Sequence, residues 1–401
     1  GLIRVLPGRV PGAGPDDPNY LLPLPGTDVG AGTAIPANPV GADGRPPAAT
    51  SAVSPCPAAA PHHNFDLTAI RKRNGANSVR YAYVPTSQAT RPDAGKAPLT
   101  MHLVAGECVT VKVTNSTEEQ RIGFDLTGLA SDTPSSGVNV GYNGDSTIPD
   151  GGTRTYTYFV DNPKFSGGAI GDLTGSSLSK SGLYGMYTVA PTGSTFTDPV
   201  TGRAVDPVTG FPADLGEAVD VKVPGGTSYR DFSLILADDE PQLGASFMPY
   251  PAGVKDPSTV LVNYRNAPRD LTRGDAFSSA VFGDPATPLL RSYVGDKVVV
   301  SVLVAPGSEQ MHSFTLGGRS FPTDARIVGS NQVTTKGVGP WEVMTAEMSA
   351  STGDHPGDYF YGDGIRAYTE AGMWGLQRIL SAPGVCPSPG AGALQCLPGL
   401  G

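Results

Sequence analysis

The sequence predicts an all-β fold made of two tandem antiparallel β-sandwiches with extended ends rich in Pro and Gly. Three observations lead to this prediction. Gly (53) and Pro (39) are abundant among the 401 residues, and both weaken helix interiors. Short runs of alternating apolar and polar residues lie between turn formers, which is typical of strands in sandwiches. Several of these segments occur twice, which indicates that one unit was duplicated.

The composition divides the chain into five parts. Residues 1–52 lack periodicity and are rich in Pro, Gly and Ala, so we expect an extended arm. The first sandwich should span 53–191 and the second 227–381. Between them, 192–226 holds two Asp-Pro-Val-Thr-Gly turns and is predicted to be a linker. The tail, 382–401, is again rich in Pro and Gly.

The two sandwiches are predicted from three matches in nearly constant register. The strand pattern of 106–113 recurs at 295–302, and Gly-Leu-Tyr-Gly at 182–185 recurs as Gly-Met-Trp-Gly at 372–375. The third match pairs Gln120, Phe124, Leu126 and Gly128 with Gln310, Phe314, Leu316 and Gly318. Further strands are expected at 153–160, with aromatic side chains on one face, and at 341–346. An all-β barrel in place of the sandwiches remains an alternative fold.

Four cysteines, Cys56, Cys108, Cys386 and Cys396, lie near the two ends of the predicted sandwiches. None forms a C-x-x-C pair, which argues against a zinc site. We expect the disulfides Cys56–Cys108 and Cys386–Cys396, the longer loop contributing about 4 kcal/mol of stability. Disulfides need an oxidising compartment, so we expect a secreted or cell-surface protein. The alternative is four buried thiols in a cytosolic protein.

Charge and hydropathy exclude several classes of partner. The net charge of −9 is spread along the chain without a basic patch, so we expect no nucleic-acid partner. No apolar run of about 18 residues occurs, so no membrane span is expected. The sequence begins at Gly1 with no visible signal peptide, and we expect a processed, mature form.

The repeated segments resemble the cupredoxin domains, Greek-key β-sandwiches, of the multicopper oxidases. The Gly-Asp/Glu strand openings, the Gln-x-x-x-Phe-x-Leu-x-Gly segments and the closing Gly-Met-Trp-Gly carry the resemblance over roughly residues 54–380. The segments 141–143, 249–251 and 262–265 are similar to the large bacterial branch that includes manganese oxidases. The resemblance implies one copper held by two His, a Cys and an axial Met, and a three-copper cluster held by eight His.

Most of the implied copper ligands are missing. The family's His-Pro-x-His-x-His motif falls on 312–317, where His312 matches the mononuclear-copper histidine. Thr315 and Gly317 stand where two cluster histidines are expected. In the first repeat, Ile122, Asp125 and Thr127 take the corresponding positions.

The family's last motif, His-Cys-His followed by His and an axial residue, is also replaced. Counting back from Gly372, the Cys falls on Asp363 and its flanking histidines on Gly362 and Gly364. The later His falls on Tyr368, and only the axial Met373 is kept. The chain has five histidines, too few for a full copper complement. We interpret His312 and Met373 as vestigial core residues and expect no metal and no cofactor.

Other candidate sites are weak. His62 and His63 are adjacent and would point to opposite faces of a strand, so we interpret them as a surface loop. One His lies among several carboxylates that could bind Ca²⁺ through oxygen ligands, although a solvated loop explains them as well: Asp354, His355, Asp358, Asp363 and Glu370. No Gly-x-Ser-x-Gly elbow or phosphate-binding loop occurs, and no catalytic residue is predicted.

Three functions follow as hypotheses. The first is a secreted structural or assembly scaffold, associating with itself or with other protein chains and not catalytic by itself. The second is one part of a copper-dependent oxidase whose metal lies on another chain or in a missing region. The third is a module that binds Ca²⁺ or a small ligand in the cavity left by the lost cluster.

Overall fold

The computed structural model describes residues 54–398 except 75–77, 120, 142, 164, 208, 239–259, 268–269, 309, 349–354 and 391. The predicted arm 1–52 therefore lies outside the described residues, as do Gln120, Tyr142, Asp354 and the segment 249–251. Within the described ranges, no helix is long and apolar enough to cross a membrane.

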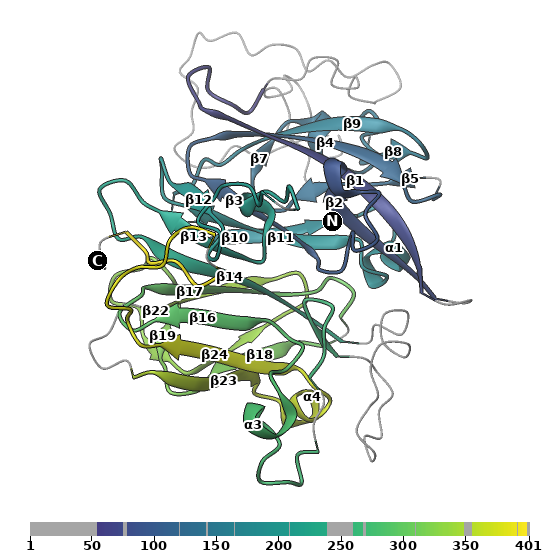
Figure 1. Ribbon diagram of the computed structural model, residues 1–401. Coiled ribbons are helices and arrows are strands. Elements are labelled where there is room, and N and C mark those ends of the chain that lie inside the picture. Colours follow the sequence, from purple (N-terminus) through teal and green to yellow (C-terminus); the bar gives the residue numbers. More distant parts are fainter. Residues whose placement is uncertain are drawn as a thin grey trace, which may run out of the picture.

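The first sandwich, in purple to teal in Figure 1, consists of two packed sheets with strand orders β2-β1-β4-β9-β7 and β3-β11-β10-β6. A separate small pair, β5-β8, contacts β4 and β9 of the first sheet, and the short helix α1 precedes the last strand. The elements are β1 His62–Asn74, β2 Ser78–Pro85, β3 Leu99–Val104, β4 Cys108–Ser116, β5 Arg121–Ile122, β6 Asp125–Leu126, β7 Ala130–Ser131, β8 Ile148–Pro149, β9 Thr153–Phe159, β10 Gly167–Gly171, α1 Ser176–Lys180 and β11 Tyr184–Ala190.

The second sandwich, in green to yellow, repeats this arrangement with the orders β12-β13-β14-β17-β22 and β16-β24-β23-β18-β21. The elements are β12 Thr195–Thr197, β13 Ala218–Lys222, β14 Tyr229–Ala237, β15 Leu261–Val262, α3 Ser279–Phe282, β16 Leu289–Tyr293, β17 Val298–Val304, β18 His312–Leu316, β19 Phe321–Pro322, β20 Gln332–Val333, β21 Thr335–Val338, β22 Val343–Met348, β23 Gly357–Asp363, α4 Arg366–Glu370 and β24 Trp374–Leu380. The 3-10 turns are η1 Thr86–Gln88, η2 Thr133–Ser135 and η3 Ala213–Leu215. The predicted all-β, two-sandwich fold is confirmed.

The repeated strands differ in how much of them is buried. In β4, Val109, Val111 and Val113 are fully buried while Lys112 is exposed, as an alternating pattern predicts. Its counterpart β17 is buried along its whole length. The even-numbered valines of β17 fill the core of the second sandwich, and Leu303 lies in a cluster shared with the first. The alternating pattern therefore predicts the face of β17 that points into its own sandwich. The opposite face is buried by packing between the two sandwiches.

The segment 192–226 is not a free linker. It contributes β12 and β13 to the second sandwich, where β13 pairs antiparallel with β14. The two predicted turns do form: Asp198 accepts hydrogen bonds from the backbone amides of Val200 and Thr201, and Asp206 accepts one from the backbone amide of Thr209. The turn residues were recognised, but the strands beside them were missed because each is only a few residues long.

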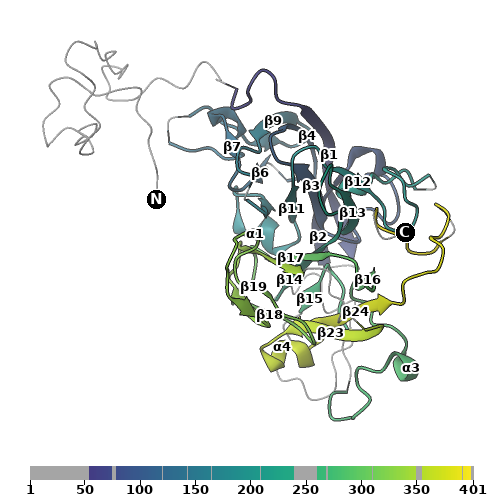
Figure 2. The same ribbon diagram turned by 90° about the vertical axis from the view of Figure 1, so that its left-hand side faces the viewer.

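The two sandwiches pack closely through an apolar cluster that includes Tyr184, Met186, Ile235, Leu261 and Leu303. Figure 2 shows the edge of this contact, where β11 of the first sandwich lies beside β14 of the second; β10 also contacts β17. Trp341 reaches across and lies against Gly171, where a Cβ atom would stand 2.1 Å from the indole ring. A side chain at position 171 would therefore separate the two sandwiches.

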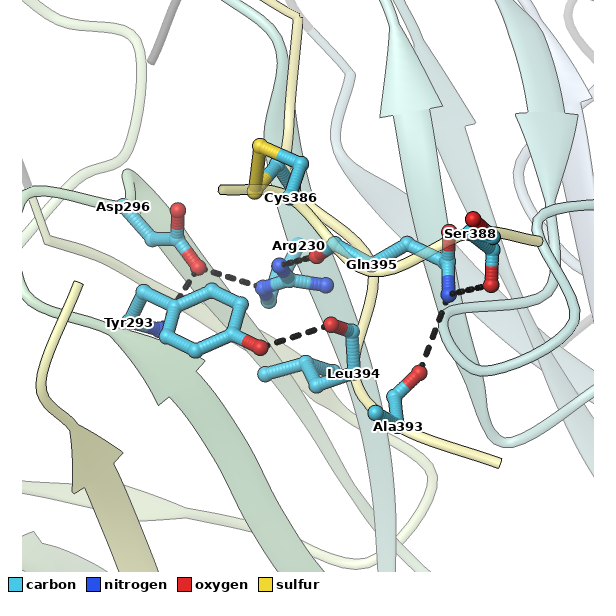
Figure 3. The surroundings of a disulfide bond; sticks show 9 residues. Arg230, Tyr293, Asp296, Cys386, Ser388, Ala393, Leu394 and Gln395 are labelled. Atoms are coloured by element: carbon cyan, nitrogen blue, oxygen red, sulfur yellow. Dashed lines mark hydrogen bonds and ion pairs between the residues drawn. A yellow bond between two sulfur atoms is a disulfide. The ribbon is translucent and has the colours of Figure 1, made fainter. Parts of the chain in front are cut away.

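Both predicted disulfides are present, Cys56–Cys108 and Cys386–Cys396. The second closes a loop in the tail, which folds back onto its own chain (Figure 3). The buried guanidinium of Arg230 donates to the carboxylates of Asp220 and Asp296 and to the carbonyl of Gln395. Tyr293 donates to the carbonyl of Leu394 at 2.7 Å. One buried cation thus connects two sheet strands and the C-terminal tail.

Replacing Arg230 with Leu should destabilise the protein by roughly 3–5 kcal/mol, because two buried carboxylates lose their counter-charge. Urea unfolding followed by fluorescence measures this. The matched control is Arg366→Leu, at a side chain that is 81% exposed, and it should change the free energy of unfolding by less than about 0.5 kcal/mol. Equal stability of the two variants would contradict the proposed role.

A histidine connects the first sandwich to the segment that follows it. His63 lies between the carboxylates of Glu107 (Nδ1···Oε1 3.1 Å) and Asp214 (Nε2···Oδ2 2.9 Å). Burial lowers the pKa of His63, but the hydrogen bonds to Asp214 and Glu107 outweigh it and raise the pKa to about 9. The predicted surface loop is wrong at this point, since His62 and His63 begin strand β1.

The raised pKa of His63 predicts a pH dependence of stability. The contribution should be complete below about pH 6.5, the unfolded value, and should be lost as pH rises through the folded value of about 9. It should amount to roughly 2–3 kcal/mol. Stability of the native chain and of His63→Gln, measured from pH 6 to 10, should converge at the alkaline end. A constant difference across that range would disprove the linkage.

Candidate functional site

Four of the sequence-predicted positions meet at one end of the second sandwich. His312 begins β18, Asp363 ends β23, Tyr368 lies on α4, and Met373 immediately precedes β24. Strands β18 and β23 are antiparallel neighbours with Phe314 opposite Asp363, which places the two strand ends together. The Met373 amide donates to the Tyr368 carbonyl at 2.9 Å, so helix α4 is tied to β24. The fold therefore gathers these residues as the resemblance implies.

The centre of this site is a buried pair of opposite charges. His312 Nδ1 lies 2.6 Å from Asp363 Oδ2, and both side chains are fully buried. The other carboxylate oxygen, Oδ1, accepts hydrogen bonds from the amides of Ser313 (3.1 Å) and Ile365 (2.8 Å). Asp363 thus joins the start of β18 to the start of the turn before α4. A buried carboxylate with this many donors is held firmly in place.

A second carboxylate and an aromatic ring enclose the other side of His312. Its Nε2 lies 3.7 Å from Asp238 Oδ2, an ion-pair distance that is too long for a hydrogen bond. The ring of Tyr368 meets the imidazole edge-on, with 4.6 Å between centroids. Burial lowers the pKa of His312, but the carboxylates of Asp238 and Asp363 outweigh it and raise the pKa above its usual value. This environment favours the imidazolium.

The residues present do not fit a mononuclear copper. Such a site needs a thiolate and imidazoles around the metal, and here the Cys position holds Asp363, which hydrogen-bonds directly to His312. The atoms Nδ1 and Oδ2 at 2.6 Å leave no space for an ion between them. Met373 is fully buried in the apolar core. A Cβ at Gly362 would stand 2.9 Å from the Met373 carbonyl, so a larger residue there would force the backbone to move.

The positions expected for cluster ligands are used for strand pairing. Thr315 donates to the carbonyl of Thr334 and accepts from the hydroxyl of Thr335. The amide of Gly317 donates to the Phe360 carbonyl at 2.7 Å. At Gly364, a Cβ would lie 2.6 Å from the Ser313 hydroxyl. These side chains offer no nitrogen or sulfur donor for copper.

The first sandwich has a version of the same corner without a histidine at the matching position. Ile122 occupies the place of His312 and is fully buried. Asp172 accepts from the amide of Gly123 at 2.7 Å, as Asp363 does from Ser313. Without a histidine beside it, burial raises the pKa of the Asp172 carboxyl. Sequence reasoning missed Asp172 because its offset from Asp363 is 191, one residue out of register with the repeat.

The two other positions of the first repeat face the domain interface. The Trp341 indole donates to the Thr127 hydroxyl at 3.2 Å, and Thr127 donates to Asp125 at 3.1 Å. Burial raises the pKa of Asp125 to about 6, although the hydrogen bond from Thr127 lowers it. Asp125 and Thr127 therefore help to hold the two sandwiches together.

The structure does not assemble the candidate calcium site. The three described carboxylates of that cluster pair with separate cations, Asp358 with Arg378, Glu370 with Arg366 and Asp363 with His312. His355 is exposed. Within the part of the chain that the structure describes, no group of three or more His, Cys, Asp and Glu side chains is placed to hold a metal ion.

Comparison with known proteins supports the fold and nothing finer. No protein-family model and no curated protein sequence matches the chain. Among solved structures, it is similar to a multicopper oxidase (TM-score 0.51, 14% identity, 82% of this chain and 93% of the other). It is also similar to the blue copper oxidase of Nitrosomonas europaea (TM-score 0.51, 16% identity, 79% of this chain and 86% of the other). The copper nitrite reductase of the same organism is similar as well, with a TM-score of 0.50 and 15% identity over 83% of this chain and 97% of the other.

These likenesses define a class: the chain has the cupredoxin-like two-sandwich fold of multicopper oxidases and copper nitrite reductase. At 14–16% identity they show the fold alone. The resemblance to the manganese-oxidase branch stays a prediction. The charged pair of His312 and Asp363 lies at positions where the resemblance implies copper ligands.

Replacing His312 with Ile, the residue that the first sandwich has there, should leave Asp363 as a buried carboxylate without a cation. We expect a loss of roughly 3 kcal/mol at pH 7, measured by urea unfolding. His355→Ile, at an exposed histidine of the same sandwich, should change stability by less than about 0.5 kcal/mol. A His312→Ile protein as stable as the native chain would show that the pair is not important for folding.

Proposed function

We propose that this chain is a secreted scaffold that uses the multicopper oxidase fold without copper chemistry of its own. The observation that carries the proposal is the direct His312–Asp363 hydrogen bond where a copper–thiolate centre would have to form. Both sandwiches keep complete apolar cores while the ligand positions hold Gly, Thr, Asp and Tyr. Two disulfides support secretion, because such bonds persist in oxidising compartments.

Assembly with other copies of the chain is supported by an exposed apolar patch at α3, consisting of Phe277, Val281 and Phe282. These side chains are 38–53% exposed. The ring of Phe277 meets that of Trp374 in a T-shaped contact, with 4.7 Å between centroids. This contact holds the patch against strand β24. Apolar clusters of this kind commonly mark contacts between proteins. The described tail packs on its own chain, so among the predicted extended ends only the arm 1–52 would remain to dock on a neighbour.

Metal analysis of the full chain tests the non-catalytic part. After secretion in copper-supplemented medium, the protein should contain far less than one copper per chain and show no copper–thiolate absorption band. It should not oxidise a phenol that a multicopper oxidase, prepared in parallel, does oxidise. Copper near one equivalent per chain would overturn the proposal.

Light scattering on the same preparation tests assembly. The native chain should have a mass of more than one subunit, and Val281→Ser with Phe282→Ser should shift it toward the monomer. The matched control is Val205→Ser, at a valine that is 50% exposed on the connecting segment, and it should leave the mass unchanged. A native chain that is monomeric at every concentration would refute self-assembly.

A further inference from the structure

A cavity of about 480 Å³ lies between the two sandwiches, away from the former copper positions. Its walls come from the end of β2 and the loop 86–98, from 198–200 and 211–218, from β16, and from Leu394 of the tail. Figure 1 shows the tail in yellow crossing this side of the molecule between the two halves. Ligand cavities of proteins typically measure 300–1,000 Å³ and often lie between domains.

The walls are held in place before any ligand binds. The tail is fixed to the connecting segment, because the Gln395 amide donates to the Pro199 carbonyl at 2.8 Å. Gln88 donates from the loop 86–98 to the Thr209 carbonyl at 3.0 Å. Arg230 holds the carbonyl of Gln395, and the disulfide closes the tail loop (Figure 3). A preformed cavity costs a ligand less ordering entropy.

The lining offers an apolar interior. Phe211 and Leu289 are partly exposed and present apolar surface to it, and Tyr83, Phe232 and Leu215 also belong to the lining. Tyr83, Phe232 and Leu215 are themselves buried, so their positions are set by the protein cores. A flat apolar body such as a fused ring system is complementary to walls of this kind.

Three cations and three carboxylates line the cavity, and two of the cations have no carboxylate partner in the described ranges of the chain. Arg91 pairs with Asp93 at 3.1 Å, Glu217 pairs with Arg265, and Asp198 accepts backbone amides in its own turn. Lys96 and Arg291 also line the cavity. Among the described residues neither has a carboxylate within ion-pair distance, and Arg291 is half-buried. The cavity therefore presents two cationic side chains, those of Lys96 and Arg291, that no described carboxylate pairs with directly.

We infer that this cavity is a binding site for a small organic anion with an apolar body. Its carboxylate pairs with the guanidinium of Arg291 and the ammonium of Lys96, while its body lies against Phe211 and Leu289. Arginine presents a planar fork that fits a carboxylate with two hydrogen bonds. Partial burial strengthens such a pair relative to one in water. This site is independent of the scaffold proposal.

Calorimetric titration of the full chain with 2-naphthoate tests the inference, and 2-naphthamide serves as the uncharged analogue of the same shape. Naphthoate should bind at least about tenfold more tightly than the amide, a difference of about 1.4 kcal/mol. Arg291→Gln should remove that preference and leave amide binding unchanged. The matched control, Arg366→Gln, removes the same charge from an exposed site on α4 and should have no effect.

Two further variants keep the test decisive. Ala97→Trp places an indole on the cavity wall and should abolish binding of both compounds, while circular dichroism and the melting temperature confirm that the variant is folded. Lys96→Gln, at an exposed lysine, should weaken naphthoate binding if Arg291→Gln fails to fold. No measurable binding of naphthoate, equal affinity for acid and amide, or unchanged binding in both charge variants would overturn the inference.

Discussion

A charge that is removed from water must be paired, and the second sandwich is arranged around two such pairs. Arg230 donates to Asp220, Asp296 and the Gln395 carbonyl from the start of β14. His312 lies between Asp363 and Asp238 at the opposite end of the sheets. Uncompensated buried charges are among the costliest defects in a protein interior. The position of the tail depends on the contacts of Arg230. The connection between β18 and the turn before α4 depends on the contacts of Asp363.

The corner at His312 shows how hydrogen bonds can connect strand ends at positions where the resemblance implies copper ligands. A metal ion joins strand ends through its ligands, and the carboxylate of Asp363 makes comparable connections through hydrogen bonds to His312, Ser313 and Ile365. In the first sandwich, Asp172 makes the same backbone contact beside Ile122. The aspartate is therefore a structural feature of both repeats, and the histidine adds a counter-charge in one of them.

The contact between the sandwiches explains several features that neither sandwich requires alone. Trp341 lies against Gly171 and hydrogen-bonds to Thr127, so a position where the resemblance implies a copper ligand stabilises the interface. The outer face of β17 is apolar because it is covered by the first sandwich. The cavity lies where the interface, the connecting segment and the tail fail to fill the space completely.

The sequence by itself determined the all-β class, the duplication, both disulfides and the alternation in β4 and β9, because strand periodicity, repeats and cysteine spacing are local properties. Tyr156 and Tyr158, predicted to share a face, are both fully buried. The strands β12 and β13 were too short to be recognised. Only the tertiary structure decided that Asp363 pairs with His312, that Asp238 approaches the same ring, and that Lys96 and Arg291 line one cavity. These residues are 51 to 195 positions apart or lie in different sandwiches, and no local pattern in a single sequence records which distant side chains share a buried space.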